Sequence, residues 1–122
     1  MKIYFAHPQT INYQELYETF KQDSFFNSHE LILPHDDKNH QNHTHDFYKT
    51  INLMIVEVSK PSTGLGIELG WAFDDNVPIY CFYKNGTTPS DSIRATTNHL
   101  SPYQNPSDLC TQIKNIELFQ KK

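Results

Sequence analysis

Short apolar runs alternate along the chain with segments of helical period, and this alternation predicts the order of its elements. Runs at 3–6, 30–33, 53–58 and 78–83 predict strands. Apolar positions at helical spacing predict helices over 13–21, 46–51, 65–76 and 109–119. The segments 35–45 and 84–103 show no such period, so we expect a loop in the first and mostly irregular structure in the second.

The predicted strands alternate with the predicted helices, which is typical of parallel βαβ units. The run at 53–58 is apolar at nearly every position and predicts a central strand covered on both faces. We therefore expect an α/β fold: a doubly wound, Rossmann- or flavodoxin-like parallel sheet of about four to five strands flanked by helices. A chain of 122 residues suits one such domain, spanning residues 1–122.

The amino-acid composition limits the kinds of molecule that we expect the protein to bind. The formal net charge is −4, so no basic surplus is present to neutralise a nucleic-acid backbone, and we expect no nucleic-acid partner. A small phosphorylated ligand stays possible. The opening apolar run is far too short for a signal sequence or a membrane span, which predicts a cytoplasmic protein with no membrane partner. Cys81 and Cys110 are expected to be reduced thiols, and neither has the basic neighbours of a nucleophile.

The densest candidate for chemistry follows the third predicted strand. There a glycine-spaced turn, with Gly64 and Gly66, leads to Glu68 at the start of the predicted helix. A carboxylate placed there is a candidate nucleophile, since the helix dipole favours its ionised form. The same residues also have a purely structural interpretation, because glycines suit tight turns and acids suit first helical turns. Glu57, inside the central strand, is an unusual polar position that needs a partner.

These residues resemble a known family. Glu57-Val58, Pro61-Ser62, Gly64-Leu65-Gly66 and Glu68-Leu69-Gly70 stand at the spacing found in the nucleoside 2-deoxyribosyltransferase family, especially in its 2'-deoxynucleoside 5'-monophosphate N-hydrolase branch. Ser90-Asp91-Ser92-Ile93-Arg94 is similar to that branch's Ser-x-x-Ile-Arg segment, and Tyr4-Phe5 stands where the family opens with a Tyr-Phe strand. The resemblance touches most of the chain but is dense only around Glu68.

The resemblance implies cleavage, by hydrolysis or transfer, of the N-glycosidic bond of a nucleoside or deoxynucleoside. Glu68 would attack the anomeric carbon to form a glycosyl-enzyme, with Tyr4 orienting it. The branch has an aspartate 24 residues before the nucleophile, where this chain has Thr44. Asp46, two residues further on, can serve as the acid only if the helix shifts. No metal and no organic cofactor are expected.

The same resemblance favours a 5'-monophosphate substrate and a homodimer. The transferases carry an aspartate six residues before the nucleophile, whereas this chain has Ser62, whose hydroxyl can donate to a phosphate. In the resembling hydrolases, a serine at the position of Ser90 reaches the phosphate in the neighbouring subunit's site, which implies a homodimer here. Arg94 is a further candidate phosphate ligand. Capping or turn formation is the structural alternative for both serines, and a solvated surface position is the alternative for Arg94.

The first loop departs from the family, which has a Gly-Ser pair where this chain has His7-Pro8. His7 could donate a hydrogen bond to the sugar or phosphate, whereas Pro8 removes a backbone donor. Gly64 and Gly66 would let the backbone approach the ligand. Tyr4 has a structural alternative as an ordinary core residue.

A histidine-rich segment follows the second predicted strand. Its imidazoles and carboxylates are competent ligands for zinc, nickel or copper, but it lacks an i, i+4 histidine pair in a convincing helix and any cysteine. We expect a solvated loop. The resemblance implies that this region closes over the nucleobase, with His35 as a base contact. The residues concerned are His35, Asp36, Asp37, His40, His43 and His45.

Two further interpretations stay open at this stage. The chain could be a nucleotide-binding protein that has lost turnover, since Asp46 and the His7-Pro8 loop both depart from the family pattern. The cleaved bond could also belong to a nicotinamide or cyclic dinucleotide. The sequence ranks neither the base nor ribose against deoxyribose.

Overall fold

The computed structural model describes residues 1–36 and 45–120 and places them in one five-stranded parallel sheet. The strand order is β2-β1-β3-β4-β5, and every neighbouring pair is parallel. The strands are β1 (Lys2–Ala6), β2 (Glu30–Ile32), β3 (Leu53–Glu57), β4 (Ile79–Lys84) and β5 (Leu100–Tyr103). The predicted single-domain α/β fold with a doubly wound parallel sheet is therefore confirmed.

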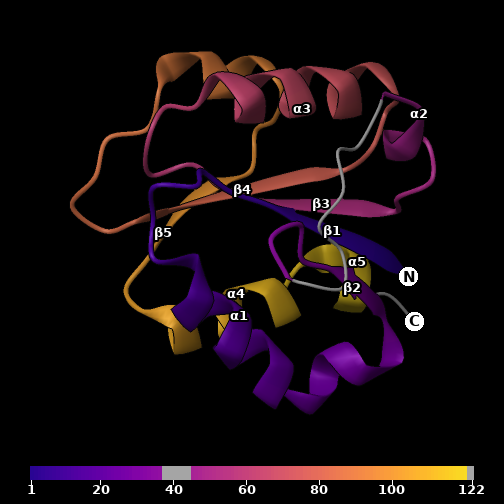
Figure 1. Ribbon diagram of the computed structural model, residues 1–122, viewed down its shortest axis with the longest axis vertical. Helices are drawn as coiled ribbons and strands as arrows, with labels where there is room; N and C mark the ends of the chain where they lie inside the picture. The colour runs from indigo at the N-terminus through magenta and orange to yellow at the C-terminus, as the bar shows by residue number, and fades with distance from the viewer. Residues whose placement is uncertain (37–44, 121–122) are drawn as a thin grey trace.

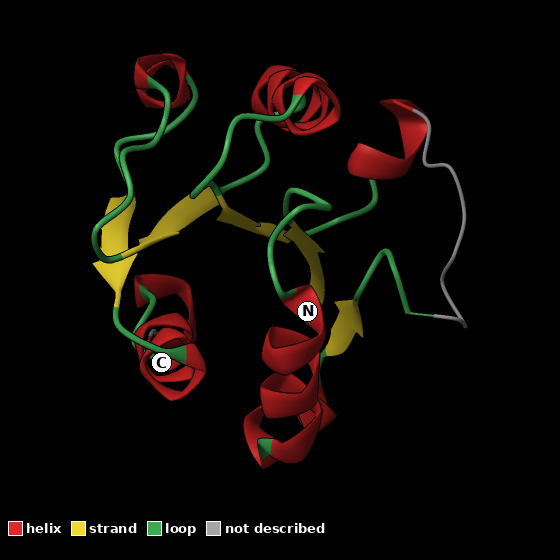
Figure 2. Cartoon of the chain, turned by 60° about the vertical axis from the view of Figure 1, so that its left-hand side comes forward, coloured by secondary structure: helices red, strands yellow, loops and turns green. Residues whose placement is uncertain are grey.

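Helices cover both faces of the sheet (Figures 1 and 2). One face carries α1 (Tyr13–Gln22), the 3-10 helix η1 (Ser24–Ser28), α4 (Pro106–Lys114) and α5 (Glu117–Gln120). The other carries α2 (His45–Tyr48), α3 (Thr63–Asp74) and the 3-10 helix η3 (Asp91–Ala95). No helix among the described residues is long and apolar enough to cross a membrane.

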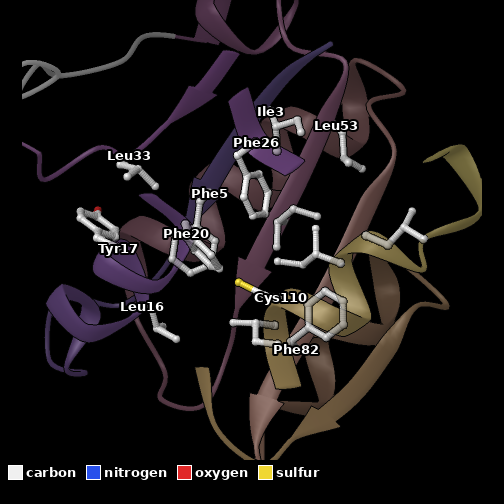
Figure 3. Packing of buried hydrophobic residues seen from close by; sticks show 14 of the residues in the cluster. Ile3, Phe5, Leu16, Tyr17, Phe20, Phe26, Leu33, Leu53, Phe82 and Cys110 are labelled. Atoms are coloured by element: carbon white, nitrogen blue, oxygen red, sulfur yellow. The ribbon is translucent and has the colours of Figure 1, made fainter. Parts of the chain in front are cut away.

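Strand periodicity divides the core into two clusters, one on each face. In β1, Ile3 and Phe5 point to the α1–α4 side, whereas Tyr4 and Ala6 point to the α2–α3 side. On the first side, aromatic rings of β1, α1 and η1 interlock around Phe20, as Figure 3 shows. A strand buried on both faces explains why the central runs are almost uninterruptedly apolar.

Three elements differ from the sequence-based expectations. The segment 84–103, expected to be mostly irregular, contains η3 and the edge strand β5. The strand escapes pattern recognition because it holds Pro102, which is tolerated at a sheet edge, and because only Tyr103 of its residues is fully buried. The terminal helix is two helices, since α4 ends at Lys114, with Asn115 as its C-cap, and α5 begins at Glu117. The element η1 was not expected at all.

The buried carboxylate of Glu57 in β3 accepts hydrogen bonds from neighbouring residues. Its side chain is 1% exposed and accepts hydrogen bonds from the Ser59 backbone N–H at 2.6 Å and the Ser59 hydroxyl at 2.8 Å. The hydroxyl of Tyr103 in β5 donates a third. Burial, with the Glu57 carboxylate beside it, raises the pKa of Tyr103, so the phenol stays protonated and acts as the donor. The network joins the edge strand to the centre of the sheet.

Replacing Tyr103 with phenylalanine tests this network. Removing one donor from a buried carboxylate should lower the free energy of unfolding by about 1–3 kcal/mol, measured by urea denaturation at pH 7. Tyr80→Phe, which removes a hydroxyl from neighbouring β4, is the matched control and should change stability by less than about 0.5 kcal/mol. Equal losses in the two variants would contradict the assignment.

Candidate active site

A pocket of about 320 Å³ lies beyond the carboxyl ends of β1 and β3, a size within the range of small-molecule sites. The chain leaves β1 toward α1 on one face of the sheet and leaves β3 toward α3 on the other (Figure 1). Ligands of α/β sheets commonly bind at such a point. The lining is formed by residues 7–10 after β1, by His35 beyond β2, and by Pro61, Ser62, Gly64, Leu65 and Glu68. The structure thus brings together five of the predicted site residues: His7, His35, Ser62, Gly64 and Glu68.

Glu68 is held by two tyrosine hydroxyls from different elements. Tyr4 of β1 donates to Oε2 at 2.6 Å, and Tyr48 of α2 donates to the same oxygen at 2.5 Å. Both tyrosines are almost fully buried, so the carboxylate is fixed by rigid neighbours. Both donors reach Oε2, and among the described residues none donates a hydrogen bond to the second carboxylate oxygen, Oε1, which can therefore contact a ligand.

The two phenols are donors under all ordinary conditions. Burial raises the pKa of Tyr4, and the negative charge of Glu68 raises it further. Burial likewise raises the pKa of Tyr48, with its hydrogen bond to Glu68 as the next cause. Tyr4 is therefore a core residue and a partner of Glu68 at once, which unites the two interpretations of its position.

One detail of the expected environment of Glu68 was wrong. The carboxylate was expected in the first helical turn, but α3 begins at Thr63, so Glu68 is its sixth residue and lies in the second turn. The field of a helix dipole fades beyond the first turn. Tyrosine hydroxyls, rather than helix-terminal amides, thus supply the hydrogen bonds to this carboxylate.

The start of α3 forms one wall of the pocket. Ser62 is its N-cap, and its Oγ accepts a hydrogen bond from the Leu65 N–H at 3.3 Å. The hydroxyl proton of Ser62 is still available to a ligand, so capping and ligand binding are compatible. A side chain added at Gly64 or Gly66 would meet no protein atom within 4 Å, and of the two only Gly64 lines the pocket.

His7 lines the pocket, but its ring nitrogens are both used within the protein. Nδ1 lies 2.8 Å from the Pro8 carbonyl oxygen, which can only accept, so this nitrogen carries the proton. Nε2 then accepts from the Tyr17 hydroxyl at 2.6 Å. Burial lowers the pKa of His7 to about 4, which keeps the ring neutral. The expected hydrogen bond from His7 to a sugar or phosphate is therefore not available in this arrangement.

His35 lies beside His7 at the same wall. Their ring centroids are 5.2 Å apart, and Tyr13 packs against both, at 4.7 Å from His7 and 5.3 Å from His35. The backbone N–H of His35 donates to the Tyr17 hydroxyl at 3.1 Å. The rings of His7 and His35 line the pocket as an aromatic wall, with Tyr13 packed against them, and such a wall suits the flat face of a nucleobase.

The structure does not bring Asp46, Ser90 or Arg94 to this pocket. Asp46 has a 90% exposed side chain and pairs with Lys49 at 3.6 Å on the surface of α2. Ser90 is exposed and its hydroxyl contacts that of Ser92 at 2.9 Å, while Arg94 is exposed on η3. The roles of these three residues stay predictions. Asp37, His40, His43 and Thr44 lie outside the described residues.

Tyr48 is the site residue that sequence reasoning missed. The search after the histidine-rich segment was for an acid, and Asp46 was taken because of its charge. A usable signal existed, because Tyr48 and Ile51 stand three residues apart in the predicted helix 46–51 and both face the core. Neither cysteine competes as a nucleophile, since burial raises the pKa of Cys81 to about 12 and that of Cys110 to about 11.

Comparison with solved structures places the fold among known proteins. No protein-family model matches the chain, and no curated protein matches its sequence. The chain is similar to the CMP N-glycosidase BcmB of Clostridium botulinum, with a TM-score of 0.66 and 17% identity over 93% of this chain and 99% of that one. It is also similar to a conserved protein of Enterococcus faecalis V583, with a TM-score of 0.60 and 16% identity over 93% and 97% of the two chains. At these identities the likeness shows a shared fold.

The buried neutral His7 predicts a loss of stability in acid. Its pKa is about 4 in the folded protein against 6.5 ordinarily, so between these values the unfolded chain binds a proton that the folded protein does not. Stability should therefore fall as pH drops through this window, by up to about 3 kcal/mol from this residue alone. The measurement is urea denaturation at several pH values on the wild type and on His7→Gln.

The variant isolates this contribution because other titrating groups act equally in both proteins. As pH falls, the free energy of unfolding of the wild type should decrease more than that of His7→Gln. His99→Gln, at an exposed histidine, should keep the wild-type pH dependence. A His7→Gln variant with the same pH dependence as the wild type would contradict a buried neutral imidazole.

Proposed function

We propose that this protein cleaves the N-glycosidic bond of a nucleoside 5'-monophosphate, with Glu68 as the nucleophile. The observation that carries the proposal is a carboxylate fixed by the Tyr4 and Tyr48 hydroxyls at the wall of a ligand-sized pocket. The fold is shared with a CMP N-glycosidase, which supports the same class of reaction.

The geometry suggests how the reaction would run. Oε1 of Glu68 attacks the anomeric carbon, and the N-glycosidic bond breaks with its electron pair passing to the base nitrogen. The base takes up a proton as it leaves. Water then attacks the same carbon, loses a proton and releases the carboxylate, which gives hydrolysis with overall retention. The hydroxyls of Tyr4 and Tyr48 bind Oε2, the oxygen that does not react, and thereby orient Oε1 for the attack.

Binding contacts divide between the two walls of the pocket. The phosphate would lie at the start of α3, where the Ser62 hydroxyl and the free backbone amides of the first turn favour an anion. Gly64 would permit close approach of the ligand to the backbone there. The base would lie against His35, whose ring packs with His7 and Tyr13.

A homodimer belongs to the same proposal. Ser90 is exposed at the N-cap position of η3 and does not line its own chain's pocket, as a residue serving a neighbouring copy would require. Arg94 lies on the same exposed element. Within the proposal, a second copy would bring Ser90 to the phosphate.

A second candidate function is nucleotide binding without turnover. It is favoured by one observation: among the residues described, no acid stands ready to protonate the leaving base at the pocket. Asp46 is exposed on α2, and both nitrogens of His7 are engaged. The aromatic wall and the start of α3 would still bind a nucleotide.

The decisive experiment is base release from a panel of ribo- and deoxynucleoside 5'-monophosphates and matched nucleosides, followed by chromatography. Wild type should release base from at least one monophosphate. Glu68→Gln keeps an acceptor for the tyrosine hydroxyls and should lower the rate by at least about a thousandfold, with nucleotide affinity within about tenfold. Glu18→Gln, at an exposed position of α1, is the matched control and should keep wild-type activity.

Each result of this panel has a definite meaning. Activity that survives Glu68→Gln would remove Glu68 as the nucleophile. Saturable binding without release from any member would favour the nucleotide-binding function. If the protein releases base from no member of the panel and binds none of them, both candidate functions are contradicted.

A pair of glycine variants tests the position of the ligand. A Cβ at Gly64 or at Gly70 meets no protein atom within 4 Å, so alanine at either should preserve the fold and stabilise α3 by up to about 1 kcal/mol. Only Gly64 lines the pocket. Gly64→Ala should weaken nucleotide binding by about tenfold or more in calorimetry, because its methyl group displaces the ligand. Equal affinities for the two variants would place the ligand elsewhere.

A further inference from the structure

Three side chains with metal-binding atoms meet where α2 lies against the end of α3. His45 Nε2 is 3.3 Å from Asp75 Oδ2 and 3.9 Å from Asp74 Oδ2. One ligand atom from each residue lies within 4.8 Å of the others. Figure 1 shows α2 beside the carboxyl-terminal end of α3, away from the loops that form the pocket.

These spacings suit a tetrahedral metal ion. Zinc binds imidazole nitrogen and carboxylate oxygen at about 2.0–2.2 Å, which places neighbouring ligand atoms of a tetrahedron about 3.3–3.6 Å apart. The His45–Asp75 separation of 3.3 Å falls at this edge length, and that of Asp74, at 3.9 Å, is slightly longer. Asp74 has a 76% exposed side chain, so a rotation of its carboxylate can shorten that distance.

Two of these atoms are buried and lack a hydrogen bond. Nε2 of His45 and Oδ2 of Asp75 face each other at 3.3 Å, yet neither makes a hydrogen bond among the described residues. At 3.3 Å the two atoms form an ion pair when the imidazole is protonated; when it is neutral with its lone pair on Nε2, two acceptors face each other, and a cation between them would satisfy both. The side chain of Asp75 is only 12% exposed.

The local charge also favours a cation. Asp74 and Asp75 stand at the carboxyl-terminal end of α3, where the helix dipole is negative, and the last turn contains no basic residue. Two carboxylates at this end are unfavourable for the helix alone. A bound divalent ion would neutralise both carboxylates and the helix terminus at once.

The imidazole is already oriented for binding. The ring of His45 stacks on Trp71 with a centroid distance of 5.4 Å and an interplanar angle of 9°. Trp71 stands four residues before Asp75 and three before Asp74, so all three share one side of the final turns of α3. Asn76, with a φ of 58°, then turns the chain away and ends the helix.

We propose that His45, Asp74 and Asp75 form a site for a divalent transition-metal ion of the zinc class, with water completing the coordination. The imidazole ligand favours zinc, cobalt or nickel over magnesium and calcium, which take oxygen ligands. The ion would tie α2 to α3. This site is separate from the pocket, so it stands or fails independently of the proposed glycosidase activity.

Isothermal titration with ZnCl₂ tests the proposal on tag-free wild-type protein, with MgCl₂ as the comparison. Wild type should bind one equivalent of zinc saturably and bind magnesium no more than weakly. His45→Ala and Asp75→Asn should each lower zinc affinity by at least about tenfold. His99→Ala removes an exposed histidine on the far side of the sheet and should keep wild-type affinity.

Cobalt spectroscopy gives a second measurement that needs no variant. Co²⁺ on wild type should show the intense visible absorption of four-coordinate cobalt, and zinc should displace it. Zinc should also raise the Tm of wild type by a few degrees and leave that of His45→Ala unchanged. Absence of saturable zinc binding, binding that survives both site variants, or equal loss in His99→Ala would overturn the proposal.

Discussion

The register between β1 and β3 is the constraint on which the site depends. The two strands are parallel neighbours, with Tyr4 opposite Met54 and Ala6 opposite Val56. Both strands therefore end at the same edge of the sheet, and the chain continues from β1 toward α1 and from β3 toward α3. A slip of one residue would turn Tyr4 to the opposite face and remove it from Glu68, since strand side chains alternate. The position of the carboxylate is thus set by sheet pairing before any loop contributes.

Two carboxylates lie near this edge, and their surroundings differ in a way that separates their roles. Glu57 is 1% exposed and accepts three hydrogen bonds, which occupy both of its oxygens. Glu68 is half-buried, lines a pocket and accepts two, both at the same oxygen. Glu57 also lines a separate pocket of about 240 Å³, but the three hydrogen bonds to its two oxygens assign it a structural role. The chemistry is assigned to Glu68 because its Oε1 accepts no hydrogen bond from the described residues.

The strands β1, β3 and β4 could be predicted from the sequence because a strand buried on both faces is apolar at almost every position. The prediction failed at the edge strand β5, where only Tyr103 is fully buried and Pro102 is typical of a loop. The spacing around Gly64 also located the pocket wall, since turn and helix start are local features. The partners of Glu68 and His7 were harder to find. The hydroxyl of Tyr48 is twenty residues from Glu68 and that of Tyr17 is ten from His7, and hydropathy carries no record of such hydrogen bonds.

The short helix α2 depends on its packing against the rest of the fold. Four residues cannot form a stable helix by hydrogen bonding alone, because nucleation costs more than so few bonds return. Tertiary contacts must therefore hold α2 in place: Tyr48 is buried against α3, Phe47 packs edge-on against Tyr4 at 5.3 Å, and His45 stacks on Trp71. The hydroxyl that fixes Glu68 thus depends on packing at both ends of α2. Any change that loosens its far end would free Tyr48 and leave the carboxylate with Tyr4 alone.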